Sequence, residues 1–139
     1  MGRILTPVTV ANFAAPEWNL HFDALVDTGA YCLTLPAVWK EKLGPLAQSV
    51  PVRVEMADHR VFEGELCGPV AVTIDGFGTA HGDVLFIDME PEDGRYEPLL
   101  GYITLEQARI AVDMVGHRLV RLPHVDVKGV GSAGALAAT

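Results

Sequence analysis

One carboxylate in this chain stands where it could do chemistry. Asp27 opens the tetrapeptide Asp27-Thr28-Gly29-Ala30, which lies between the apolar runs 24–26 and 33–35. This arrangement predicts an acidic turn between two buried strands. A carboxylate held there and paired with a second one could take a proton from water, while its partner donates a hydrogen bond to a carbonyl oxygen. Such a pair shares one proton, because two adjacent carboxylates cannot both ionise.

The Asp-Thr-Gly turn occurs once, so a matching carboxylate has to come from a second copy of the chain. Gly29 has no Cβ and would let two backbones approach closely. Thr28 could hydrogen-bond across the symmetry axis and hold the two loops together. Asp113 and Asp126 lie outside any comparable turn and are not expected to supply the second group. The chemistry therefore predicts a homodimer.

The elements around the turn are predicted to be strands. Residues 18–27 alternate between apolar and polar types and lead directly into Asp27. Fourteen glycines and nine prolines divide the rest into short segments, which suits strands and tight turns better than long helices. The expected strands are an opening one at 3–13 and three hairpins, at 50–56 with 60–66, at 70–74 with 79–87, and at 110–114 with 118–122.

Two short helices and two irregular segments complete the expected layout. Pro36 permits a helix at 37–43, and Thr104 is the expected N-cap of another. Residues 90–98 are polar and predict a surface loop. From residue 124 the composition shifts to small residues, which divides the chain into a folded domain, 1–123, and a Gly/Ala-rich tail, 124–139, either loose or in contact with the dimer partner.

Composition excludes several classes of protein. The net charge of −8 is wrong for a nucleic-acid-binding surface or a polybasic membrane anchor. We expect no signal peptide and no membrane-spanning helix, because no apolar run approaches the roughly 20 residues that a span needs. Cys32 and Cys67 are expected to be free thiols in a reducing cytoplasm. The five histidines lie far apart, so no metal site is expected.

Residues 25–30, Leu-Val-Asp-Thr-Gly-Ala, resemble the active-site loop of the retropepsin-like aspartic proteases. A second segment, Pro98-Leu99-Leu100-Gly101, is similar to the stretch of two apolar residues and a glycine that passes behind the catalytic loop in that family. Residues 56–64 occupy the place of the family's flap, the hairpin that closes over substrate. The resemblance covers nearly the whole chain up to Leu122.

The resemblance implies an all-β, closed barrel of retropepsin type that acts as a homodimeric aspartic endopeptidase on peptide or protein substrates. An enzyme of this type needs no metal or organic cofactor, so none is expected here. Asp27 would be the catalytic residue. Thr28 and Gly29 would order the active-site loop, and Leu99, Leu100 and Gly101 would support it from behind. Gly29, Ala30 and Tyr31 would line the substrate channel. Ala57, Asp58 and His59, in the flap, would cover that channel.

Departures from the family pattern leave alternatives open. Tyr31, Cys32 and Leu33 stand where retroviral members usually carry polar residues, and the flap has no Gly-rich tip. One alternative is a dimer of the same fold that binds peptides or serves as a scaffold without catalysis. Another is a monomeric β-barrel in which Asp27 only forms a turn. Cys32 would need a positioned base to act as a nucleophile, so a packed thiol is expected.

Overall fold

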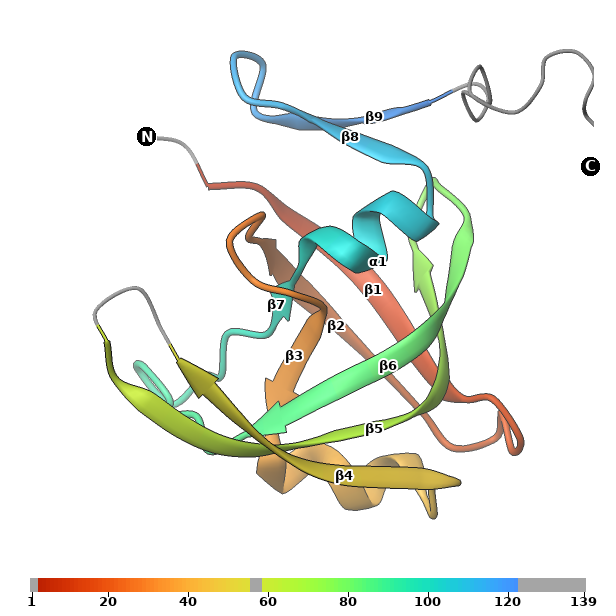
Figure 1. Ribbon diagram of the computed structural model, residues 1–139. Helices are drawn as coiled ribbons and strands as arrows, with labels where there is room; N and C mark the ends of the chain where they lie inside the picture. The colour runs from red at the N-terminus through yellow and green to blue at the C-terminus, as the bar shows by residue number, and fades with distance from the viewer. Residues whose placement is uncertain (1–2, 56–58, 123–139) are drawn as a thin grey trace, which may run out of the picture.

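The computed structural model describes residues 3–55 and 59–122, and these residues form an all-β domain with two short helices (Figure 1). Both helices are short: η1 is a 3₁₀ helix of seven residues and α1 an α-helix of six. No helix in the described ranges has the length and apolar character needed to span a bilayer. In chain order the elements are β1 (Leu5–Asn12), β2 (Asn19–Val26), β3 (Leu33–Pro36), η1 (Ala37–Leu43), β4 (Gln48–Glu55), β5 (Val61–Ile74), β6 (Thr79–Ile87), β7 (Leu99–Leu100), α1 (Tyr102–Gln107), β8 (Ile110–Asp113) and β9 (Arg118–Arg121).

Seven strands form one sheet that closes on itself. Their order is β1-β2-β7-β3-β6-β5-β4, and β1 pairs with β5 as well as with β2. Six strands therefore complete a ring, which confirms the predicted closed barrel. The remaining strand, β4, pairs with β5 outside that ring over its full length, from Gln48 opposite Gly68 to Glu55 opposite Val61. The β8–β9 hairpin is a separate sheet at the end of the molecule opposite η1 (Figure 1).

The core follows from the alternation of side chains along the strands. In β1 every second residue from Thr6 to Asn12 is buried, and its neighbours are more exposed. Asn12 is the polar exception. Its Nδ2 donates hydrogen bonds to the carbonyl oxygens of Leu43 at 2.9 Å and Pro45 at 2.8 Å, so its burial is compensated and β1 is tied to the end of η1. The largest fully buried side chains include Phe86, Leu33, Leu35, Leu43, Ile74 and Leu100.

The predicted hairpins are confirmed, but β5 is longer than expected. The sequence predicted separate strands at 60–66 and 70–74, each in its own hairpin, with Gly68 and Pro69 lying between them. Instead β5 runs without a break over 14 residues, and its pairing with β6 shifts register between Cys67 and Val70. An irregularity of this kind accommodates a proline, which has no N–H to donate to the ladder.

Thr104 is not a helix N-cap, so that prediction is wrong. The helix α1 begins at Tyr102, and its cap position, Gly101, lies three residues before the predicted one. Thr104 is buried inside the helix, and its Oγ1 accepts a hydrogen bond from the backbone N–H of Leu33 at 3.3 Å. A long-range contact with β3 has replaced the local capping contact. The other predicted helix is present at 37–43 as η1.

Asp113 closes the turn of the β8–β9 hairpin. Its Oδ1 accepts hydrogen bonds from the N–H groups of Val115 at 3.1 Å and Gly116 at 2.9 Å, and Arg118 Nε lies 3.0 Å from Oδ2. The Gly116 N–H and then the Arg118 guanidinium hold the pKa of this carboxyl below its ordinary value. The role is structural, which agrees with the prediction that Asp113 is no catalytic partner. The predicted tail, 124–139, and its boundary lie outside the described residues.

Replacing Asp113 with asparagine is expected to make stability less dependent on pH in the acidic range. A carboxylate whose pKa is lower in the folded state stabilises the fold above its unfolded pKa, and this contribution is lost as the pH falls through the folded pKa. Melting temperatures of the native chain and Asp113→Asn should therefore differ at neutral pH and converge in acid. Asp75→Asn is the control, since the described residues give that carboxylate no hydrogen bond. A constant difference across pH would contradict the assignment.

Candidate active site

The backbone on both sides of Asp27 is held by the segment that the sequence identified as its support. β2 pairs in parallel with β7, with Leu25 opposite Leu99 and Val26 opposite Leu100. The Asp27 N–H donates to the carbonyl oxygen of Leu100 at 3.0 Å, and the Leu25 N–H donates to that of Pro98 at 2.8 Å. On its other side β7 meets β3 in antiparallel pairing, Leu99 opposite Thr34. The end of β2 is thus fixed by a strand from a distant part of the chain.

The carboxylate of Asp27 is oriented by its own turn. The Gly29 N–H donates to Asp27 Oδ1 at 2.9 Å, and the Ala30 N–H donates to the Asp27 backbone oxygen at 3.0 Å. Asparagine and aspartate commonly form this kind of turn, in which the side chain accepts a hydrogen bond from the residue two positions on. Asp27 is half-buried, whereas Thr28 and Gly29 are exposed. The carboxylate is therefore held in one orientation beside accessible backbone.

Gly101 allows the supporting segment to touch the loop. A Cβ on this glycine would lie 2.6 Å from both the N and the O of Cys32 and 2.7 Å from the carbonyl oxygen of Ala30. The next two residues complete the junction, because the Tyr102 N–H donates to Ala30 O at 3.0 Å and the Ile103 N–H to Tyr31 O at 2.9 Å. Any side chain at position 101 would push backbone away from backbone.

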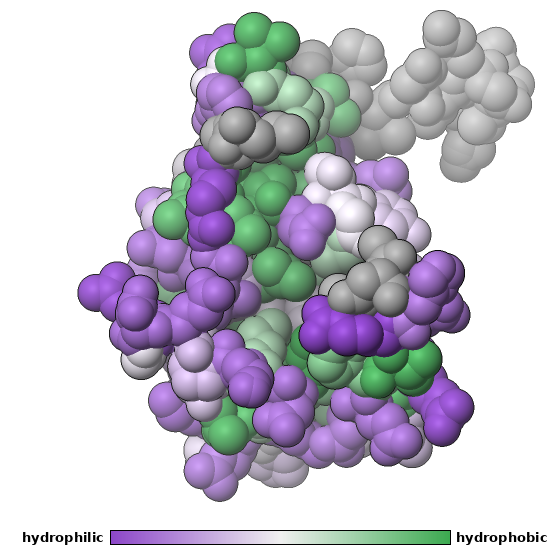
Figure 2. Space-filling model, turned by 90° about the vertical axis from the view of Figure 1, so that its left-hand side faces the viewer, coloured by the Kyte–Doolittle hydropathy of each residue, from purple (hydrophilic) through white to green (hydrophobic). Residues whose placement is uncertain are grey.

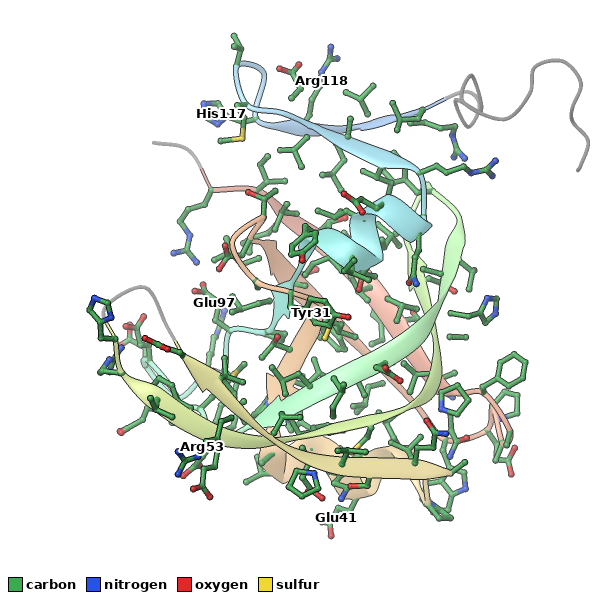
Figure 3. All side chains as sticks on the ribbon, in the orientation of Figure 1. Tyr31, Glu41, Arg53, Glu97, His117 and Arg118 are labelled. Atoms are coloured by element: carbon green, nitrogen blue, oxygen red, sulfur yellow. The ribbon has the colours of Figure 1, made fainter. Side chains whose placement is uncertain are left out.

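A cleft of about 600 Å³ opens beside Asp27, between the loop and the β4–β5 hairpin. Figure 3 shows Tyr31 on the loop before β3 and Arg53 on β4, which forms the facing wall. The volume lies within the usual range of peptide or small-molecule sites. The cleft is lined by Asp27, Gly29, Ala30, Tyr31, Thr34, Val52, Arg53, Val54, Glu55, Leu66, Leu85, Ile87 and Leu99.

The structure brings most of the predicted site residues together. Some line the cleft, some lie behind the loop, and some face solvent. Asp27, Gly29, Ala30, Tyr31 and Leu99 line the cleft. Leu100 and Gly101 lie behind the loop, and Thr28 is exposed beside it. His59 is 88% exposed in its side chain, and its Nδ1 lies 3.3 Å from Glu55 Oε2, so it faces solvent near the hairpin tip. Ala57 and Asp58 lie outside the described residues.

The sequence did not identify the apolar wall of the cleft. Val52 and Val54 on β4, Leu66 on β5 and Leu85 and Ile87 on β6 line the space opposite Asp27. In β4, Val52 and Val54 alternate with Arg53 and Glu55 and mark one apolar face, whereas residues 84–87 of β6 are apolar on both faces. Which of those faces meets the cleft depends on how the barrel closes, and a strand pattern does not contain that information.

Cys32 follows the Asp27 loop but is a packed thiol, as predicted. It is buried, and its Sγ lies 3.5 Å from the carbonyl oxygen of Leu33. Burial, and secondly the charge of Asp83, raise the pKa of this thiol to about 11. Thiolate is the reactive form, so a thiol with this pKa is a poor nucleophile at neutral pH. Within the described ranges no three His, Cys, Asp or Glu side chains form a group that could hold a metal ion.

Both cysteines are expected to resist alkylation in the folded protein. Cys32 and Cys67 are free and buried, and reagents such as iodoacetamide require an accessible thiolate. Mass spectrometry after brief treatment at neutral pH should show unmodified chains, and treatment in denaturant should modify both residues. Rapid labelling of Cys32 under native conditions would show instead that the loop opens and exposes the thiol.

Comparison with known proteins shows similarity in fold but not in sequence. No protein-family model matches the chain, and no curated protein sequence matches it. Among solved structures, EIAV protease complexed with the inhibitor HBY-793 superposes with a TM-score of 0.55 at 18% sequence identity. The match covers 86% of this chain and 93% of the viral one. The chain therefore has a retropepsin-like fold, as the sequence predicted.

Proposed function

We propose that this chain is an aspartic endopeptidase that acts as a homodimer, with Asp27 of each copy supplying one carboxylate. The observation that carries the proposal is the placement of Asp27 at the edge of a cleft. There the Gly29 N–H orients its side chain, and Leu100 holds its backbone. The likeness of fold to a viral protease supports the same conclusion.

The reaction would use a water molecule held between the two carboxylates. The charged carboxylate takes a proton from the water as its oxygen attacks the peptide carbonyl carbon, and the protonated one donates a hydrogen bond to the carbonyl oxygen. A proton then passes to the leaving amine and the C–N bond breaks. The titration belongs to the pair and not to either residue. No metal or organic cofactor takes part in this scheme.

The second carboxylate is assigned to another copy because the cleft of one chain offers no matching partner among its described residues. Glu55 is the other carboxylate that lines it, but this side chain lies on β4, is 65% exposed and contacts His59. Thr28 and Gly29, in contrast, are exposed beside Asp27, where a second identical loop could meet them. A homodimer would thus complete the site.

Activity per chain at increasing dilution tests this proposal. Cleavage of an unfolded protein should weaken per chain as dilution separates the dimer, and sedimentation should show the mass falling in parallel. A crystal of the dimer should show the two Asp27 carboxylates within hydrogen-bond reach of one water. Full activity in a monomer would contradict the shared site.

The non-catalytic alternative rests on Tyr31. This side chain is 54% exposed, lines the cleft beside Asp27 and packs edge-on against Tyr102, with the ring centroids 5.9 Å apart. An exposed tyrosine pair at a cleft suits peptide binding. A dimer that binds peptides without turning them over would support this alternative. A cytoplasmic location is proposed for either function, because both cysteines are free.

A further inference from the structure

The cleft continues into a second depression that we call the side groove. Its nearer part, about 450 Å³, shares Ile87 and Leu99 with the cleft, and its farther part, about 780 Å³, shares Glu92, Arg95 and Glu97 with the nearer one. The groove therefore leads from the catalytic side of the molecule along residues 88–97 toward η1. Figure 2 shows apolar surface on this side of the molecule bordered by hydrophilic residues.

Negative charge dominates the side groove. Two arginines line it, Arg60 and Arg95, against six carboxylates: Asp23, Asp88, Glu90, Glu92, Asp93 and Glu97. Glu97 is paired with Arg3, and Arg60 stacks on Phe62 with its guanidinium carbon 5.2 Å from the ring centroid. Even with both arginines counted, an excess of carboxylates remains. The groove is therefore complementary to a cation.

Aromatic rings form one wall of the farther part. Phe22 and Trp39 have centroids 5.5 Å apart, and Trp39 and Tyr96 have centroids 6.0 Å apart. All three rings are half-buried, so they have faces or edges toward the groove. Trp39 already accepts one cation, since Lys42 Nζ lies 5.9 Å from its centroid. Aromatic rings beside carboxylates suit a flat cation with an apolar body, and a guanidinium has both properties.

We infer that the substrates of this enzyme carry a basic residue, arginine in preference to lysine, on one side of the scissile bond, and that its side chain occupies the side groove. The inference rests on the proposed function, because it assumes that a peptide chain lies in the cleft. The apolar wall formed by Val52, Val54 and Leu85 would take the residues next to the scissile bond. The acidic groove would take the flanking cation.

Peptide pairs that differ only in charge test the inference. Each pair has an apolar centre and carries either arginine or citrulline, its uncharged analogue, at one flanking position, and successive pairs move that position outward. Fluorescence anisotropy with the Asp27→Asn chain measures binding without cleavage. At one position the arginine peptide should bind about three to ten times more tightly than its citrulline partner, and added salt should reduce the difference.

A matched set of variants locates the effect. In the Asp27→Asn background, the pair of changes Glu92→Gln and Asp93→Asn should remove most of the arginine preference and leave citrulline peptides unaffected. Glu41→Gln is the control, because it also replaces a carboxylate with an amide but Glu41 lies on η1 and points away from the molecule (Figure 3). A preference that survives the change at 92 and 93 would overturn the assignment.

Cleavage by the native chain separates this inference from the proposed function. Preferential binding of arginine peptides without any cleavage would support the side groove and contradict the protease. Cleavage at equal kcat/KM for arginine and citrulline peptides would support the protease and overturn the side groove. Failure of every peptide to bind would overturn the side groove as well.

Discussion

Asp27→Asn is expected to lower kcat/KM for peptide cleavage by about a thousandfold or more and to leave the fold unchanged. A positioned general base contributes roughly 10²–10⁴ to such a rate, and an amide cannot take the proton from water. The asparagine Oδ1 can still accept the hydrogen bond that Gly29 donates to Asp27 at 2.9 Å. The turn should therefore keep its shape while the chemistry is lost.

Steady-state cleavage of an unfolded protein, together with thermal melting and sedimentation, measures both halves of this expectation. The native chain and the variant should melt together and have the same mass in solution. Asp75→Asn, a change at an exposed turn away from the cleft, should retain full activity. Retained cleavage in Asp27→Asn would exclude the proposed mechanism.

Gly101→Ala is expected to be among the most destabilising single changes in the domain, at about 3 kcal/mol. The added methyl group would meet backbone atoms of Ala30 and Cys32 at 2.6–2.7 Å, and a backbone cannot rotate away as a side chain can. Relief requires the loop and the β7–α1 junction to separate, which would stretch the hydrogen bonds from Tyr102 and Ile103. Activity should fall with stability because the same loop carries Asp27.

Urea unfolding of the two chains gives the difference in the free energy of unfolding. Gly78→Ala is the control, since a Cβ there meets no atom within 4 Å, and its effect should stay within about 0.5 kcal/mol. Equal stability of Gly101→Ala and the native chain would show that the two backbones move apart readily. Close contact at Gly101 would then not be required to support the loop.

Local patterns were sufficient to predict the strands and the Asp-Thr-Gly turn. Alternation along 18–27 located β2, and the Asp-Thr-Gly turn after it placed Asp27 between two strands. Turn residues between apolar runs located the hairpins β4–β5, β5–β6 and β8–β9. These features depend on neighbouring residues, so the sequence contains them directly.

Features that depend on distant contacts escaped prediction. Thr104 was expected to cap a helix, but its hydroxyl oxygen instead accepts a hydrogen bond from the backbone N–H of Leu33 in β3. The cleft wall formed by Val52, Leu66 and Leu85 required knowledge of which strand faces meet when the barrel closes. The side groove depends on the packing of residues 88–97 near η1, which no local pattern encodes.

The parallel pairing of β2 with β7 also governs when the proposed active site can form. During synthesis Asp27 leaves the ribosome about 70 residues before the backbone that supports it, Pro98 to Leu100. Contacts between distant parts of a chain form late, because the loop between their ends has to close first. A nascent or truncated chain that stops before residue 98 would carry the aspartate without its support. Under the proposed function, the growing polypeptide and its neighbours would thus be protected from cleavage until this support is in place.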